Sequence, residues 1–276
     1  MNRLSTSKRA QIVASLVEGN SIRATVRMTG AAKNTVMKLL LDLGQACQYF
    51  HDETVRGLSC KRIEVDEIWS FCYAKAKNVP IEKSCQLGVG DIWTWTAICA
   101  DTKLVPCWVV GGRDAGYATA FMYDLASRLT ERIQLTSDGY QPYLNAVPEA
   151  FGNDIDYAML VKMFREDRSK NPERKYSPGK INGARKTAVI GSPDIEKVST
   201  SYAERLNLTT RMSVRRFTRL TNAFSTKLFN LECAVALHFT QYNFCRKHQT
   251  LKTTPAVAAN VTDHVWPLEE LVGLLD

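Results

Sequence analysis

The segment Arg62–Tyr73, RIEVDEIWSFCY, has the composition of a buried β-strand. It is rich in β-branched and aromatic residues, which strands favour. Asp66 lies in the middle of this apolar segment, where an ionised carboxylate is costly unless it is paired or bound to a metal. The next residue, Glu67, is expected on the opposite face of the strand, as a surface residue or as a partner of the site. The segment therefore predicts a strand and a first candidate site residue.

The segments that follow predict a sheet flanked by helices. Strand patterns cover Gln86–Ala100 and Leu104–Val110 and are typical of a hairpin. An amphipathic helix is predicted over Tyr117–Leu129, and a strand over Ile133–Thr136 that ends near Asp138. Three strands in a meander, then a helix and a strand with an acid at its end, resemble the opening of a ribonuclease H-like domain. We expect an α/β fold with a mixed sheet flanked by helices.

The whole domain is predicted to run from residue 62 to residue 252, and a C-terminal tail is predicted over 253–276. Residues 165–200 are expected to form a basic insertion, with a loop over Arg165–Lys186 and a hairpin leading back to the domain. Further elements are predicted as a helix over Tyr140–Phe151, a strand over Tyr157–Phe164, hairpin strands over Lys186–Ile190 and Lys197–Thr200, and a long helix over Leu228–Lys247.

Residues 1–46 predict a small all-α domain of the helix-turn-helix kind, joined to the rest by a linker over residues 47–61. Three short helical patterns occur there, and a glycine-containing turn precedes the third. The third helix would lie in the DNA major groove. The alternative is a three-helix packing domain with a solvated basic face. The residues expected near bases or phosphates are Lys33, Asn34, Thr35 and Lys38.

Composition favours a soluble protein with a polyanionic partner. The chain has 276 residues, is 45% hydrophobic and carries a formal charge of +8. No apolar run of about 18 residues and no secretory signal occurs, and none of the eight cysteines forms a Cys-x-x-Cys pair. We therefore expect a reduced, cytoplasmic setting, with the protein associated with the nucleoid of a prokaryotic-type cell, and no zinc finger.

The segment Ser201–Arg219, SYAERLNLTTRMSVRRFTR, predicts a helix with one acid among several arginines. Helical spacing places Glu204, Asn207 and Arg211 on one face. The alternative is a solvated helix in which Glu204 pairs with Arg205 or Arg211. The arginines expected to contact phosphates are Arg205, Arg211, Arg215, Arg216 and Arg219.

Three acids on adjacent elements form the candidate catalytic site: Asp66, Asp138 and Glu204. Such a set suits two hard divalent cations, Mg²⁺ or Mn²⁺, about 3.5–4 Å apart, which stabilise the attacking and leaving oxygens of a phosphoryl transfer. Each acid also has an alternative. Asp138 precedes a glycine as turn aspartates do, and Glu232 is a rival third acid, although its helical neighbours are apolar.

Four motifs occur in order: VDEIWSF, TSDGYQPY, SYAERLNLTTR and YNFCRKHQTLKTTPA. In this combination the chain resembles insertion-sequence transposases of the DDE type, within the retroviral-integrase-like superfamily. The resemblance implies that Asp66, Asp138 and Glu204 bind metal, with Asn207 and Arg211 as supporting and phosphate-contacting residues. It also implies that a further set lies beside the site, for which helix-end capping and surface pairing are the alternative: Asn243, Arg246 and His248.

The resulting hypothesis is a DNA transposase that binds the ends of its element, cuts them with metal-activated water and joins the freed 3′-hydroxyl to target DNA. Two ends are joined, so we expect a dimer or higher assembly on DNA. One alternative is a DNA-binding regulator that keeps the fold but is catalytically silent. Another is a recombinase with Tyr140 or Tyr202 as the nucleophile, which would form a covalent adduct with DNA.

Overall fold

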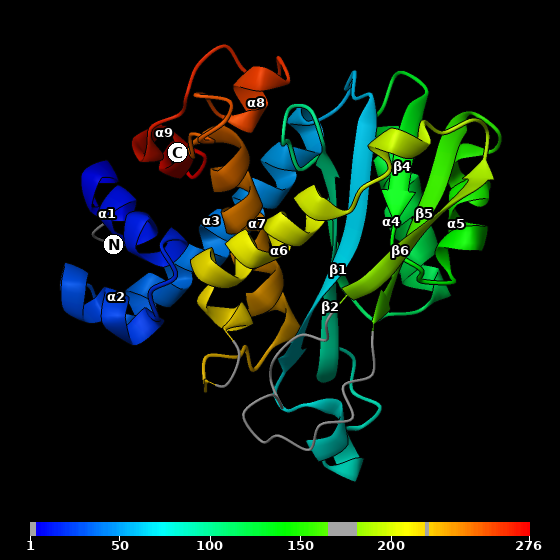
Figure 1. Ribbon diagram of the computed structural model, residues 1–276. Helices are drawn as coiled ribbons and strands as arrows, with labels where there is room; N and C mark the ends of the chain where they lie inside the picture. The colour runs from blue at the N-terminus through cyan, green and yellow to red at the C-terminus, as the bar shows by residue number, and fades with distance from the viewer. Residues whose placement is uncertain (1–3, 165–180, 219–220) are drawn as a thin grey trace.

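The computed structural model describes residues 4–164, 181–218 and 221–276, which form one mixed sheet covered by helices (Figure 1). The predicted basic loop therefore lies mostly outside the described residues, and so does Arg219. No described helix is long and apolar enough to cross a membrane. The strands are β1 (Arg62–Cys72), β2 (Gly90–Cys99), β3 (Trp108–Gly111), β4 (Ile133–Ser137), β5 (Ile155–Phe164) and β6 (Ile181–Ile190). The α-helices are α1 (Thr6–Val17), α2 (Ile22–Thr29), α3 (Lys33–Thr54), α4 (Ala115–Ser127), α5 (Tyr143–Phe151), α6 (Ser201–Ser213), α7 (Leu228–Phe244), α8 (Pro255–Ala258) and α9 (Leu268–Gly273).

The six strands lie in the order β3-β2-β1-β4-β5-β6, so the strand that carries Asp66 is central. β1, β2 and β3 form an antiparallel meander, whereas β1, β4 and β5 run parallel. β6 pairs antiparallel with β5 at the edge of the sheet. The predicted mixed sheet flanked by helices is confirmed, and the arrangement is consistent with a ribonuclease H-like fold.

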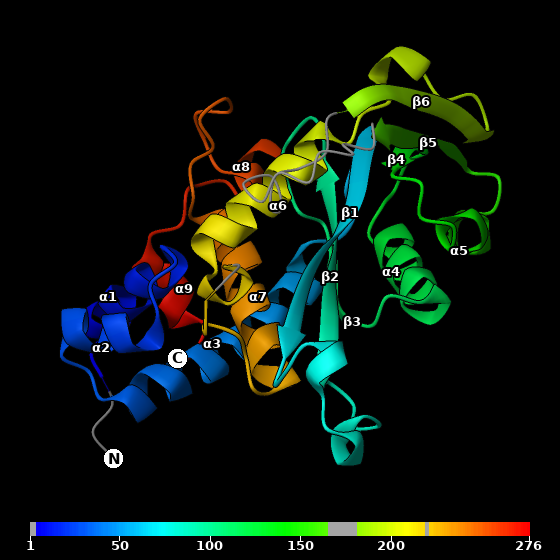
Figure 2. The same ribbon diagram turned by 60° about the horizontal axis from the view of Figure 1, so that its bottom comes forward.

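Helices cover the two faces of the sheet (Figure 2). Side chains along β1 point alternately to the two faces and so contact both helical layers. Ile63 and Val65 belong to the apolar core beneath α4 and α5. Ile68 and Cys72 belong to the second core, which includes residues of α1, α3, α6 and α7. Asp66 is an even-numbered residue like Ile68, so the strand presents it on the side of α6.

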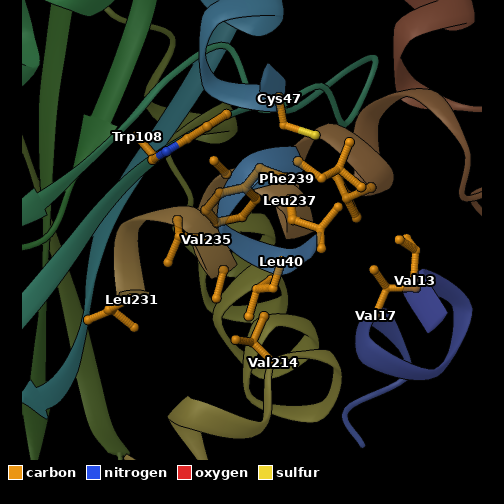
Figure 3. Close-up of a cluster of buried hydrophobic side chains, with 14 of the residues drawn as sticks. Val13, Val17, Leu40, Cys47, Trp108, Val214, Leu231, Val235, Leu237 and Phe239 are labelled. Atoms are coloured by element: carbon orange, nitrogen blue, oxygen red, sulfur yellow. The ribbon is translucent and has the colours of Figure 1, made fainter. Parts of the chain in front are cut away.

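The N-terminal helices share this second core rather than forming one of their own. Figure 3 shows Val13 and Val17 of α1 and Leu40 of α3 in the same cluster as side chains of α7. α3 and α7 cross at Gly44, where an added Cβ would lie 2.5 Å from the Cβ of Cys233. A side chain at this position would prevent so close an approach of the two helices.

Several predicted boundaries are wrong. α3 continues to Thr54 because it packs along α7, so the first part of the predicted linker, residues 47–61, is helical. The predicted strand over Lys186–Ile190 is confirmed, but it begins at Ile181, within the predicted loop, and it pairs with β5 and not with Lys197–Thr200, which is no strand. The predicted tail contains α8 and α9, and α9 packs against α1. There, Arg9 donates hydrogen bonds to the carbonyl of Val272 and to Asp276.

Candidate active site

Asp66 and Asp138 are brought together by the parallel pairing of β1 with β4. The register joins Glu64 to Thr136, and two residues further along each chain lie Asp66 and Asp138. Carboxylate oxygens of Asp66, Glu67 and Asp138 lie within 4.8 Å of one another. This is an acidic cluster of three residues, two of which the sequence predicted as site residues.

Asp66 is held at both of its oxygens. Its Oδ1 accepts a hydrogen bond from the backbone N–H of Glu67, and its Oδ2 accepts one from Nδ2 of Asn207, each 2.8 Å long. Burial raises the pKa of Asp66 to about 7, and the nearby charges of Glu67, Asp138 and Glu204 act in the same direction. Near neutral pH this carboxyl therefore exchanges between its charged and protonated forms.

Glu67 is buried on the other face of the sheet, against α4 and α5, so its predicted role as a surface residue is wrong, and its role as a partner of the site stays a prediction. Arg113 donates to its Oε2 from Nε at 3.1 Å and from Nη2 at 3.0 Å, and the hydroxyl of Tyr143 donates to Oε1. Burial is the main cause that raises the pKa of Glu67. Strand alternation correctly separates it from Asp66, yet its longer side chain brings its carboxylate to the same cluster.

Asp138 has the contacts of a turn aspartate and also lies in the acidic cluster. Its Oδ1 accepts a 2.8 Å hydrogen bond from the backbone N–H of Tyr140, as a turn aspartate does. It also contributes an oxygen to the acidic cluster. The turn fixes this carboxylate at the end of β4, beside β1.

The start of α6 is anchored to β1 by Glu64, a residue that the sequence did not single out. Glu64 is buried, and its Oε2 accepts hydrogen bonds from the backbone N–H groups of Tyr202, at 2.7 Å, and Ala203, at 3.1 Å. These are first-turn donors that have no partner within the helix. Burial raises the pKa of Glu64, whereas the two backbone hydrogen bonds lower it. A carboxylate on the central strand thus fixes α6 over the sheet.

Glu204 lies on α6 and forms an ion pair with Lys162 of β5. It also accepts a 2.7 Å hydrogen bond from the hydroxyl of Thr200. This partner differs from the alternative drawn from the sequence, in which Glu204 pairs with Arg205 or Arg211. Glu204 is not among the three acids whose oxygens lie within 4.8 Å, although its charge contributes to the raised pKa of Asp66.

The donor atoms at this site fit a hard divalent cation. Such ions prefer carboxylate and carbonyl oxygens. Besides the three carboxylates, Oδ1 of Asn207 is buried without a hydrogen-bond partner. A buried amide oxygen of this kind is usually satisfied, so an incoming cation or its bound water could take it up. The carboxylates of Asp66, Glu67 and Asp138 are the residues that could hold a cation in this conformation, with Glu204 nearby on α6.

The residues predicted to bind DNA lie in different environments. Lys33, Asn34 and Lys38 are exposed near the start of α3, Lys38 forms an ion pair with Asp42, and Thr35 is half-buried. Arg205 is exposed on α6, whereas Arg211 and Arg215 are half-buried. Arg216 is half-buried as well. Its Nε donates to the hydroxyl of Ser225 at 2.7 Å, and burial lowers its pKa.

The three residues expected beside the site separate into two groups. Asn243 is fully buried and bonds to both backbone groups of Val105, so it joins α7 to the segment between β2 and β3, contrary to the prediction. Arg246 donates to the hydroxyl of Ser213 at 3.0 Å. Arg246 and His248 line a groove together with Arg205.

Comparisons with known proteins find a likeness in structure. No family model matches the sequence, and no curated protein matches it. Among solved structures, the chain is similar to the cryo-EM structure of the piggyBac transposase synaptic complex with hairpin DNA, with 9% sequence identity and a TM-score of 0.38. The alignment covers 98% of this chain and 69% of that one.

Proposed function

We propose that this protein is a DNA transposase of the DDE type, which cuts the ends of an insertion sequence and joins them to target DNA. The observation that supports it is the meeting of Asp66 and Asp138, from adjacent parallel strands, with Asn207 of α6 bonded to Asp66. Carboxylates gathered in this way repel one another unless a cation is present. Metal-dependent phosphoryl transfer on DNA is chemistry that uses such a site.

Asp66, Asp138 and Glu204 are the proposed metal ligands, and Glu67 lies beside them. When bound, two Mg²⁺ or Mn²⁺ ions would supply Lewis acidity and a nucleophilic water or hydroxyl at neutral pH. The chain's own residues prepare the site: Asn207 fixes the orientation of Asp66, and Arg113 compensates the charge of Glu67. Glu204 must exchange Lys162 for the cation.

DNA binding is proposed to involve two basic regions. The first is the start of α3, where α2, the turn at Gly30 and α3 would act as a helix-turn-helix; Gly30 has a φ of 70°, which a tight turn between helices requires. The second is the arginine-containing segment that begins in α6. Because two ends must be joined, the active form is proposed to be a dimer or higher assembly on DNA.

The decisive experiment compares wild type with Asp66→Asn in cutting and joining of DNA that carries the ends flanking the reading frame. With Mg²⁺ present, the variant should lose activity by at least about 10³-fold, because it lacks one ligand of the cation that stabilises the charge of the transition state. Its affinity for DNA in EDTA should stay unchanged. Cutting at the wild-type rate would refute the catalytic assignment.

The two alternatives differ in their products. A silent regulator would bind DNA and show no cutting with either metal. A tyrosine recombinase would leave a covalent adduct, which denaturing gels detect. Desolvation raises the pKa of Tyr140, which works against its action as a nucleophile.

A further inference from the structure

A groove of about 560 Å³ lies along the flank of α6 that faces away from the acidic cluster. Tyr202, Arg205 and Thr209 line it, at the i, i+3 and i+7 positions of one helix face. Glu204 and Asn207 point from the other side of the same helix, toward Lys162 and Asp66. The remaining wall comes from Lys103 after β2 and from the segment that follows α7, which includes Arg246 and His248.

Lys103 places a buried positive charge in the wall of this groove. Only 8% of it is exposed, and its backbone φ of 61° is uncommon for a residue other than glycine. Its ammonium donates to the carbonyl of Ala100 and lies 3.8 Å from the ring centroid of Tyr202. No salt bridge to Lys103 occurs among the residues that the structure describes. A buried ammonium without an anion is costly, because desolvation is compensated only in part by a carbonyl and a ring.

Two further cations line the same groove. Arg205 and Arg246 likewise form no salt bridge within the described parts of the chain, although Arg246 contacts Ser213. The positive potential extends to His248, whose pKa is lowered by burial first and then by Lys103, Arg246 and Arg205. The groove therefore gathers positive charge that no described carboxylate compensates.

We propose that this groove binds a backbone phosphate of the DNA strand, with Lys103, Arg205 and Arg246 as its ligands. Tyr202, which is exposed and also lines it, offers aromatic surface for the adjoining sugar or base. A strand that crosses the exposed side of α6 would connect the two flanks over about 10–12 Å, the width of a helix with its side chains. The inference deepens the proposed function and rests on it for the identity of the strand.

The test measures binding without catalysis. Fluorescence anisotropy in EDTA, with a labelled duplex that has a single-stranded 3′ extension, would compare wild type with Lys103→Gln, Arg205→Gln and Arg246→Gln. Each substitution should weaken binding about tenfold, and each should reduce the slope of log affinity against log salt by about 0.7–0.9. Lys103 is buried, so Lys103→Gln could disturb folding. Arg205 is exposed, so Arg205→Gln tests the groove without that risk.

The matched control is Lys197→Gln, which removes one positive charge from an exposed residue already paired with Asp194 at 2.8 Å. Its affinity and salt slope should stay at wild-type values. Unchanged salt slopes in all three groove variants would overturn the proposal. So would variants that lose affinity for inorganic phosphate but keep it for DNA, because the groove would then be a small-anion site.

The same variants separate this inference from the proposed function. If the groove variants bind DNA normally while Asp66→Asn abolishes cutting, the groove assignment fails and the transposase assignment stands. If the groove variants bind weakly while Asp66→Asn still cuts, the groove assignment stands and the catalytic one fails.

Discussion

The two flanks of α6 carry opposite charges, and the protein compensates them differently. On the acidic flank, Arg113 and Lys162 supply cations to Glu67 and Glu204. On the basic flank, Lys103 has a carbonyl and an aromatic ring but no salt bridge among the described residues. The acidic flank is therefore partly balanced by cations of the chain itself, whereas no described carboxylate forms a salt bridge with Lys103 on the basic flank. One helix lies between the proposed cation site and the proposed phosphate site.

The largest effect on this arrangement should come from Glu64→Ala, which removes the anchor common to both flanks. Two N–H groups at the start of α6 lose their acceptor in a buried setting, which we expect to cost about 2–3 kcal/mol of unfolding free energy. Urea denaturation would measure the loss, and both DNA affinity and cutting should fall with it.

Glu64→Gln serves as the conservative comparison, because it keeps one acceptor oxygen and should lose less. Glu131→Ala, at an exposed glutamate, is the control for loss of a carboxylate. If Glu64→Ala were as stable as Glu131→Ala, α6 would not depend on this anchor.

A smaller effect of opposite sign is expected from Asp66→Asn in metal-free protein. The pKa of Asp66 is about 7 in the folded protein and near 3.8 ordinarily, so the folded state binds more protons between these values. Its contribution to stability is present below pH 4 and is lost as the pH rises through 7. The variant should therefore be more stable than wild type by about 1–3 kcal/mol above pH 8.

Thermal unfolding across this pH range would check the prediction. The two proteins should converge toward pH 4, and Mg²⁺ should raise the melting temperature of wild type more than that of the variant. The amide of Asn207 can turn to present its free oxygen to the new side chain, which limits the disturbance. A variant less stable than wild type at pH 8 would contradict the raised pKa.

The smallest effect on stability should come from Lys162→Gln. The ion pair with Glu204 is partly exposed, so its loss should cost less than about 1 kcal/mol. Mg²⁺ affinity should nevertheless rise several-fold, because Lys162 no longer competes for Glu204. Titration calorimetry would measure it, with Lys186→Gln, on the exposed part of β6, as the control. Unchanged Mg²⁺ affinity would show that Glu204 is not a ligand.

The sequence predicted the centre of the sheet well and its periphery less well. Arg62–Cys72 is a strand almost as predicted, because its apolar residues pack into a core on each face of the sheet, which favours a strand over other structures. The first half of β6 was missed because an edge strand tolerates the polar and basic residues that otherwise indicate a loop. The length of α3 was missed because its second half is specified by contact with α7, which no local pattern reveals.

The site residues whose position depends on the order of the strands could be predicted from the sequence. Those whose position depends on the length and direction of a side chain could not. Asp66 and Asp138 follow from the order of the strands. Glu67 does not, because alternation gives the face of a residue but not where a long side chain ends. Glu64 and Lys103 acquire their roles through contacts with Tyr202, which lies far away in the sequence.

The packing of α1 against α9 has a consequence for synthesis of the protein. Arg9 bonds to the carbonyl of Val272, a separation of 263 residues, so α1 has no partner there until α9 has left the ribosome. α2 and α3 follow α1 directly and can cover its side that includes Val13 and Val17, but the surface of α1 that packs against α9 stays uncovered for most of the time that elongation takes. This corner of the protein can therefore be completed only after α9 has been synthesised.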